Sequence, residues 1–348
     1  MSHKGKQSIK SYSLDQLEQV ATDLGQPKFR AKQLYEWLHV HNAGAYDEMT
    51  NIPKPMRQAL ERDYPLEEAR VVQVMESKDG TRKYILKLGD DAMVECVGIP
   101  DGDEDVRLTV CCSTQVGCAM NCAFCATGHQ GLTRNLTADE IVDQVIAVGR
   151  DFDSRVSNVV LMGQGEPFQN YDATLEAMRR MNSDAGIDIG ARHITVSTSG
   201  LCDEIEAFAD EPEQFRLAIS LHSADQAIRN MIMPRLSGQN LKRLQSALKH
   251  YNTVKGRRIT LEYMLLDGIN DTDKDLQKLI EFCEGLNVHV NILPFNAIEG
   301  SEFQPSIPQL ANHWRNMLEN AGIPCSIRSS RGSDIAGACG QLITESQR

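Results

Sequence analysis

The sequence Cys118-Ala-Met-Asn-Cys-Ala-Phe-Cys125 contains three cysteines separated by three and then two residues. Three thiolates this close together can bind three irons of a [4Fe–4S] cube and leave the fourth iron open to a small molecule. Ferredoxin motifs differ, because their four cysteines saturate the cluster. A structural zinc site needs four ligands and usually two Cys-x2-Cys pairs, and here Cys112 or His129 would have to complete it. The spacing therefore favours a cluster with one open iron over zinc.

Composition and charge limit the class of protein. The chain has 348 residues, 41% of them apolar, which suits one large α/β domain with an accessory piece. No stretch approaches the roughly 18 apolar residues of a membrane span, so we expect no membrane association. The net charge of −12 argues against non-specific coating of nucleic acid, which needs many Lys and Arg side chains. Residues 1–15 lack the apolar core of an export signal, so we expect ten reduced cysteines in a cytoplasmic protein.

Residues 1–90 are predicted to form a small helical accessory domain that a strand pair joins to the main body. Ser13-Leu-Asp-Gln16 is a capping box, which marks the start of a helix. The alternation of apolar residues from 71 to 88, with Gly80 as a turn signal, predicts the strand pair. The expected helices cover residues 14–24, 29–40 and 54–63.

From Arg107 onward, apolar runs rich in β-branched residues alternate with helical patterns. This alternation implies parallel strands joined by right-handed crossovers. Residues 91–348 are therefore predicted to be an α/β domain, an incomplete (β/α)6 barrel with its chemistry at the C-terminal ends of the strands. The expected strands are 108–111, 158–162, 193–196, 216–220, 258–265 and 288–293, and the expected helices are 137–152, 171–182, 240–251 and 275–286.

Compact polar or metal-binding sequences follow five of the six expected strands. Each is an ordinary turn sequence when taken alone. Because the ends of parallel strands meet at one rim of a barrel, their joint placement favours a ligand site. In chain order they are the cysteine run, Gly163–Pro167, Ser197–Gly200, Ser220–His222 and Pro294–Asn296.

With these motifs in place, the chain resembles the RlmN/Cfr group of radical S-adenosylmethionine (SAM) RNA methyltransferases over nearly its whole length. The cysteine spacing is the one that radical SAM enzymes use. The most specific matches are Cys111-Cys-Ser-Thr-Gln-Val-Gly-Cys118, Leu161-Met-Gly-Gln-Gly-Glu-Pro167 and the segment Gly332–Leu342. Phe29–Trp37 and Glu48–Pro53 are similar to the accessory domain of that group.

The resemblance implies a reaction that uses two SAM molecules, because the adenine carbon and the SAM methyl group are both electrophilic. The first SAM methylates a cysteine thiolate. The second binds the open iron of the [4Fe–4S] cluster and is cleaved to a 5′-deoxyadenosyl radical, which takes a hydrogen atom from the S-methyl group. The carbon radical then adds to adenine, and a second cysteine releases the methylated base by forming a disulfide.

Carried over residue by residue, the resemblance implies that Cys339 is the methyl carrier and Cys111 the resolving thiol. Each would otherwise be a buried structural cysteine. Glu95 matches the proton acceptor near the target base, and its apolar strand would tend to raise its pKa. Met162 matches a methionine beside the carrier, although a strand methionine is more often part of a core. Cys112 stands where the group more often has an aliphatic residue, so it is a candidate substitute for Cys111.

The resemblance also implies a SAM site at the rim of the barrel. Its members offer a carboxylate for an ammonium group, and hydroxyl, imidazole and amide groups for ribose and adenine. Gln164 departs from the group, which usually has Met there. The implied residues are Gly165 and Glu166 at the methionine amino group, with Ser197, Ser220, Leu221, His222 and Asn296 around the nucleoside. The other cysteines, Cys96, Cys202, Cys283 and Cys325, are interpreted as buried structural thiols.

The leading hypothesis is methylation of adenosine C2 in 23S ribosomal RNA and in tRNA, next to the anticodon. Methylation of C8 in the same ribosomal adenosine is the alternative within the group. From other classes, an RNA-binding protein with a cluster or zinc and no turnover, or a radical SAM reaction without a carrier cysteine, stays open. We expect a monomer reduced by a flavodoxin-type partner, with Lys28, Arg30 and Lys32 contacting RNA.

Overall fold

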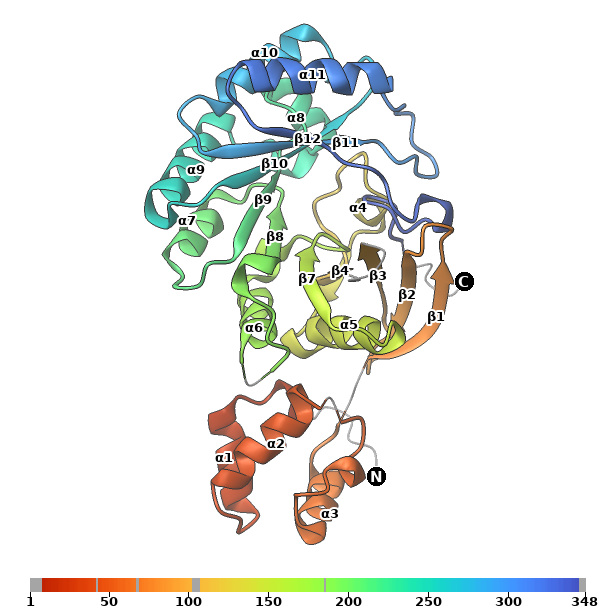
Figure 1. The fold of residues 1–348 in the computed structure, drawn as a ribbon, viewed down its shortest axis with the longest axis vertical. Coiled ribbons are helices and arrows are strands. Elements are labelled where there is room, and N and C mark those ends of the chain that lie inside the picture. The colour runs from red at the N-terminus through yellow and green to blue at the C-terminus, as the bar shows by residue number, and fades with distance from the viewer. Residues whose placement is uncertain (1–7, 42, 67–68, 102–106, 185, 344–348) are drawn as a thin grey trace.

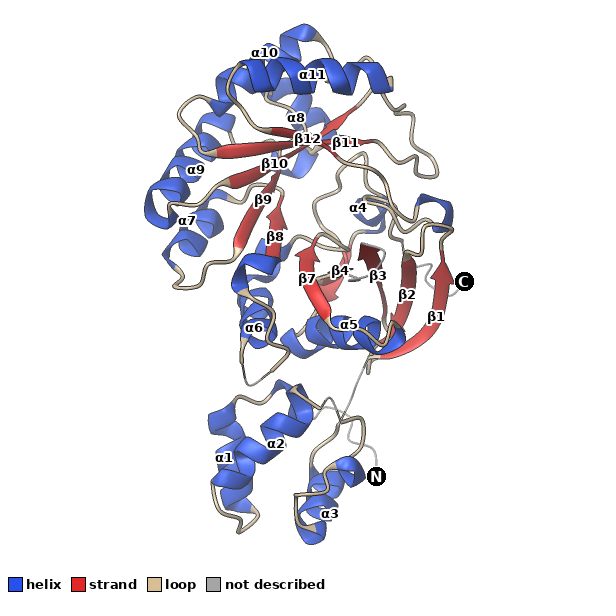
Figure 2. Ribbon diagram, in the orientation of Figure 1, coloured by secondary structure: helices blue, strands red, loops and turns tan. Residues whose placement is uncertain are grey.

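The computed structural model describes residues 8–41, 43–66, 69–101, 107–184 and 186–343. Its main feature is one curved sheet of ten strands in the order β1-β2-β3-β4-β7-β8-β9-β10-β11-β12 (Figure 2). Three helices at the N-terminal end form a separate body below this sheet (Figure 1). In the described chain, no helix is both long and apolar enough to cross a membrane.

The N-terminal helices are α1 (Leu14–Asp23), α2 (Phe29–His39) and α3 (Lys54–Asp63), close to the predicted ranges. The predicted capping box at α1 is present, because Ser13 Oγ accepts from Gln16 N while Gln16 Oε1 accepts from Ser13 N. The helices enclose a core of their own, separate from that of the sheet. Its fully buried members include Leu17, Leu34, Leu38 and Leu60.

Buried polar contacts join the N-terminal segment to the main body. Lys10 Nζ lies 3.1 Å from Asp143 Oδ1, and both side chains are almost fully buried. The second oxygen of Asp143 accepts from Ala69 N at 2.9 Å. Arg180 donates to the carbonyl oxygens of Lys10 and Ser11 at 3.0 Å each. These bonds fix the chain on both sides of the helical region against the main body.

The parallel part of the sheet contains the six predicted strands. They are β4 (Arg107–Cys111), β7 (Val156–Leu161), β8 (Ile194–Thr198), β9 (Arg216–Ser220), β10 (Ile259–Leu265) and β11 (Val288–Pro294). A seventh parallel strand, β12 (Cys325–Ile327), pairs with β11 and was not predicted. The fold is therefore the predicted incomplete barrel with one short strand added at its edge.

Helices between the strands pack on the outside of the curved sheet and bury its main core (Figure 2). The predicted helices are present as α5 (Ala138–Asp151), α6 (Tyr171–Asn182), α9 (Leu241–Lys255) and α10 (Asp273–Cys283). Four further helices were not predicted: α4 (Ala126–Gln130), α7 (Cys202–Asp210), α8 (Gln226–Ile232) and α11 (Pro308–Asn320).

Antiparallel strands extend the sheet on its N-terminal side. They are β1 (Arg70–Glu76), β2 (Arg82–Lys87) and β3 (Met93–Asp101), and β3 pairs with β4. The predicted strand pair is therefore continuous with the barrel sheet. A small separate hairpin of β5 (Gln115–Gly117) and β6 (Leu132–Asn135) flanks the cysteine run.

Candidate active site

The cysteine run forms a tight loop between β5 and α4. Gly117 opens it with a φ of +77°, and a Cβ there would lie 1.9 Å from the carbonyl oxygen of Gly131. Cys118 N donates to the same oxygen at 2.9 Å. At the other end, a Cβ on Gly128 would lie 2.9 Å from Cys122 N. The glycines thus let the backbone close around the three cysteines.

The three thiols of this loop influence one another. Burial raises the pKa of Cys118 to about 12, and the pKa of Cys122 is raised by burial and then by Cys125 and Cys118. Within the described ranges, no three side chains form a ready-made metal site. The donor set nevertheless fits an iron–sulfur cluster, because it offers three neighbouring thiols and buried apolar neighbours such as Met120. A bound cation would favour the thiolate forms that burial disfavours.

The turn after β7 is held by contacts that leave no room for larger residues. Gly165 has a φ of +105°, and a Cβ there would lie 2.7 Å from the side chain of Gln115. Glu166 is buried, and its carboxylate accepts from Phe168 N at 3.0 Å and from Ser199 N at 2.7 Å. Burial raises the pKa of Glu166, and these bonds oppose that effect. Glu166 therefore ties the end of β7 to the end of β8.

Gln164, the residue that departs from the family pattern, links two parts of the site. Its Oε1 accepts from Glu95 N at 3.0 Å, and its backbone N donates to Ser113 Oγ at 2.8 Å. Ser113 Oγ in turn donates to the carbonyl oxygen of Glu95 at 2.6 Å. The glutamine thereby fixes β3 to the rim, a role that its position in the sequence does not reveal.

The ends of β8 and β9 bring Ser197, Ser220, Leu221 and His222 to the same rim. The backbone N–H groups of Leu221 and His222 both donate to the carbonyl oxygen of Glu262, at 3.0 and 3.1 Å. His222 Nδ1 accepts from Met264 N at 3.2 Å, so Nε2 carries the proton of the neutral ring. Burial, followed by the charge of Arg229, lowers the pKa of His222 to about 3. The imidazole is therefore neutral at physiological pH.

Cys339 belongs to the C-terminal segment, which lies next to the cysteine loop. Its carbonyl oxygen accepts from Asn296 Nδ2 at 3.1 Å, and the next carbonyl, of Gly340, accepts from Ala126 N at 2.8 Å. Cys339 is solvent-exposed, yet the dense protein around its thiol raises the pKa to about 12, with further contributions from Cys111, Cys125 and Glu262. The thiol of this exposed residue thus stands within electrostatic reach of both the cysteine loop and Cys111.

Cys111 ends β4 and is partly exposed, whereas Cys112 is fully buried. Burial raises the pKa of Cys111 to about 12, and a hydrogen bond from the backbone N–H of Met162 opposes that effect. The structure thus brings Cys111, Met162 and Cys339 into one region. The other four cysteines, Cys96, Cys202, Cys283 and Cys325, are buried, in agreement with the interpretation from sequence.

Glu95 is 1% exposed on β3 and has partners that the sequence did not predict. Lys83 Nζ lies 3.2 Å from Glu95 Oε1, and the backbone N of Ile343 donates to Glu95 Oε2 at 2.9 Å. As expected from its apolar strand, burial raises the pKa of Glu95, and Lys83 opposes that effect. The carboxylate is therefore paired on one side and covered by the C-terminal segment on the other.

The three basic residues predicted to contact RNA lie on and before α2, away from this rim. Lys28 is exposed and pairs with Glu18 at 2.9 Å. Arg30 donates to Asn51 O at 2.8 Å and lies over the ring of Phe29, so much of its bonding capacity is used within the domain. Lys32 is exposed.

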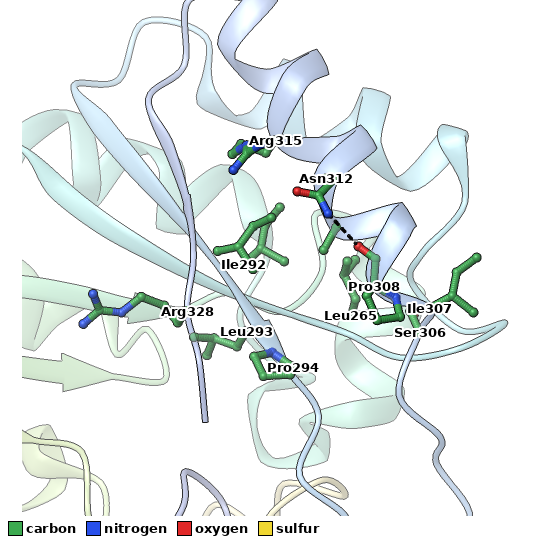
Figure 3. Close-up of a pocket in the computed structure, with 12 residues that line it drawn as sticks. Leu265, Ile292, Leu293, Pro294, Ser306, Ile307, Pro308, Asn312, Arg315 and Arg328 are labelled. Carbon is green, nitrogen blue, oxygen red and sulfur yellow. Dashed lines mark hydrogen bonds between the residues drawn. The ribbon is translucent and has the colours of Figure 1, made fainter. Parts of the chain in front are cut away.

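A cavity of about 340 Å³ lies outside the rim, between α11 and the ends of β10 and β11 (Figure 3). Leu265, Ile292 and Pro308 form apolar walls, and Arg315 and Arg328 stand at its edge. Pro294, from one of the predicted strand-end sequences, lines it, but none of the residues predicted to hold the cluster, bind SAM or act in catalysis does. The candidate site is therefore defined by the strand ends and not by this cavity.

Comparisons with known proteins agree with this geometry. Residues 112–283 match the radical SAM superfamily, and residues 8–64 match the N-terminal domain of ribosomal RNA large subunit methyltransferases. Relatives from Staphylococcus aureus strains JH9 and Newman, each named "Probable dual-specificity RNA methyltransferase RlmN", are 42% identical over 340 residues, or 97% of this chain and 93% of theirs.

A solved structure extends the agreement to three dimensions. The crystal structure of a radical SAM methyltransferase from Sphaerobacter thermophilus superposes with a TM-score of 0.91 at 40% identity, covering 96% of this chain and 98% of that one. The similarity therefore covers both matched regions and extends over nearly the whole fold. The chain belongs to the RlmN family of radical SAM RNA methyltransferases.

Proposed function

We propose that this protein methylates adenosine C2 in 23S ribosomal RNA and in tRNA, with Cys339 as the methyl carrier. The observation that supports this most is the position of Cys339, an exposed residue whose thiol is influenced by both Cys111 and Cys125. A carrier must be reached by SAM, by the radical and by the resolving thiol, and this position suits all three. The "dual-specificity" in the names of the relatives supports two classes of RNA substrate.

The residues take successive roles in the proposed reaction. Cys339, as a thiolate, attacks the methyl group of one SAM and displaces S-adenosylhomocysteine. A cluster held by Cys118, Cys122 and Cys125 would supply the electron for reductive cleavage of a second SAM, and the resulting 5′-deoxyadenosyl radical would take a hydrogen atom from the S-methyl group of Cys339. Cys339 would then link to adenine C2 through the methylene carbon, and the radical adduct would return one electron to the cluster held by the three cysteines as Glu95 takes the C2 proton. The Cys111 thiolate attacks the sulfur of Cys339 and forms a disulfide, and the methylene carbon leaves with the bonding electron pair and takes up a proton, which gives the methylated base.

The other predicted residues hold the reactants. Cys118, Cys122 and Cys125 would bind the cluster, and SAM would lie against Gly165, Glu166, Ser197, Ser220, Leu221, His222 and Asn296. Met162 would pack beside the carrier. A flavodoxin-type reductant would supply the electron for SAM cleavage. We further propose that the protein is monomeric and cytoplasmic.

The N-terminal region, residues 1–90, is proposed to grip the RNA. Lys28 and Lys32 are exposed there and can neutralise phosphates. Changing both to Glu should weaken binding of a substrate RNA fragment about uniformly across sequences and reduce the salt dependence of the affinity. Lys274→Glu, at an exposed position on α10, is the control that should keep wild-type affinity. An unchanged affinity in the Lys28/Lys32 variant would move the RNA contact elsewhere.

The experiment that tests the reaction is expression in a strain that lacks its own C2 methyltransferase. The 23S rRNA and tRNA are digested to nucleosides, and methyladenosines are identified by chromatography and mass spectrometry. 2-Methyladenosine is expected with the wild-type chain and with Cys325→Ala, a buried cysteine outside the site. It should be absent with Cys339→Ala, although the iron content stays at the wild-type level.

Other outcomes have distinct meanings. 8-Methyladenosine would replace the C2 assignment with the C8 alternative. Product formation by Cys339→Ala would refute the carrier role, and would favour a radical SAM reaction without a carrier. Neither product, from protein with a full complement of iron, would mean that the target of the radical is different.

A further inference from the structure

Arg229 is a buried cation for which the proposed reaction has no use. It lies on α8 and is 2% exposed. Its Nε donates to Leu221 O at 3.2 Å, and its Nη2 donates to Ser199 O and Ser220 O. These carbonyls lie at the ends of β8 and β9, so one guanidinium fixes the backbone of two strand ends that the proposed SAM site uses.

Among the residues that the structure describes, no carboxylate bonds to this side chain. Within the described residues, its hydrogen-bond acceptors are all carbonyl oxygens. Burial lowers the pKa of Arg229 to about 10, and Cys122 and Cys202 oppose that effect. The group therefore keeps its positive charge at neutral pH. An unpaired buried charge is costly, so its retention needs an explanation that the fold alone does not give.

The helix that carries Arg229 packs directly on the cysteine loop. Ala123 N, next to Cys122, donates to Ile232 O at 2.9 Å near the end of α8. Ile232 and Met233 share one buried apolar cluster with Cys118 and Met120. Arg229 also lowers the pKa of Cys122, although burial dominates the pKa of that thiol. The charge is thus fixed beside the loop that would hold the cluster.

We propose that Arg229 is a positioning residue that raises the reduction potential of the cluster held by Cys118, Cys122 and Cys125 while fixing the ends of β8 and β9. Reduction adds one negative charge at the cluster, and a fixed positive charge nearby stabilises that state. Screening by water and salt is weak because the guanidinium is buried. Local charge and solvent exposure are established determinants of cluster potentials. The inference rests on the proposed cluster and not on the RNA target.

The test is a redox titration of the reconstituted holoprotein, monitored by the electron paramagnetic resonance signal of the reduced cluster. Wild type is compared with Arg229→Lys, Arg229→Gln and Arg229→Met, and with Arg243→Met as a control at a half-buried arginine that pairs with Asp203 and Glu206. The two neutral variants are expected to hold at least tenfold less reduced cluster relative to oxidised cluster at the wild-type midpoint, a shift of about 59 mV for one electron. Arg229→Lys should stay nearer to wild type because it keeps the charge.

Equal potentials in Arg229→Lys and a loaded neutral variant would overturn the proposal, because a purely structural role does not depend on charge. If only Arg229→Lys binds a cluster, the charge requirement is supported. Failure of all three variants to bind it would overturn the proposal, since shape and not charge would then be required. An absence of cluster in the wild-type protein would instead refute the proposed function.

Discussion

Replacement of Lys83 by methionine tests the buried ion pair between Lys83 and the proposed base, Glu95. Lys83 Nζ lies 3.2 Å from Glu95 Oε1, with 7% and 2% of the two side chains exposed. Methionine keeps most of the apolar stem of Lys83. The Glu95 carboxylate then keeps one hydrogen bond, from the backbone N–H of Ile343. Removal of one member of a buried ion pair costs about 3–5 kcal/mol. We expect Lys83→Met to lose about that much unfolding free energy at pH 8.

The cost should depend on pH in a defined direction. Burial raises the pKa of Glu95 and Lys83 opposes that effect, so Lys83→Met raises the pKa further. A carboxyl group with a folded pKa above its unfolded value of about 4.3 binds its proton more tightly in the folded state. Stability therefore falls as pH rises from the unfolded to the folded pKa. The loss in Lys83→Met should be largest above the folded pKa and small near pH 4.

Urea unfolding at several pH values, followed by circular dichroism and tryptophan fluorescence, measures this cost. Lys87→Met is the matched control on the same strand, because its pair with Asp91 is exposed and is worth at most about 1 kcal/mol. Combining Lys83→Met with Glu95→Gln removes both charges and should recover most of the loss. A cost independent of pH, or a double variant no more stable than the single one, would refute the reasoning.

Three further variants test other parts of the site. Cys111→Ala should trap an RNA–protein adduct through Cys339, seen as a shifted band of labelled RNA on a denaturing gel, and adding Cys112→Ala should not change the yield because Cys112 is 0% exposed; no adduct would count against the resolving role. Gly117→Ala should lower bound iron severalfold in a colorimetric assay, because the new Cβ would lie 1.9 Å from Gly131 O, whereas Gly268→Ala, with φ +66° and open space, should keep its iron; equal iron contents would show that the loop can yield. Glu262→Gln should flatten the pH dependence of stability, because burial raises the pKa of Glu262 to about 7 and its carboxyl therefore costs about 3 kcal/mol more at pH 8 than near pH 4; parallel stability curves for the variant and wild type would contradict this.

Features specified by local sequence were predictable. The capping box at Ser13 opens α1 as expected, because cap and partner are only three residues apart. The apolar runs that alternate with helical patterns correctly predicted all six central strands. The strand β12 has three residues at the sheet edge, which is too short for a periodic pattern. The nine residues of α7 begin directly after the rim turn, where the polar sequence reads as a loop.

Contacts between distant segments were not predictable from one sequence. Lys83 and Glu95 meet because β2 and β3 pair in a register that opposes Ile85 to Glu95, and no short motif encodes that register. Arg229 lies in an ordinary amphipathic segment, and its carbonyl partners come from two other strand ends. The predicted site residues were placed by motif, whereas the groups that orient them come from tertiary packing.

The segment that carries Cys339 also closes access to Glu95. Thr127 Oγ1 donates to Leu342 O at 2.6 Å, and Ile343 N occupies the oxygen of Glu95 that Lys83 leaves free. In the proposed reaction the nucleotide needs this oxygen and would have to displace the segment first, so the described residues up to Ile343 would compete with the substrate. Binding of RNA and release of the segment are then thermodynamically linked: whatever stabilises the closed form weakens RNA affinity by the same free energy.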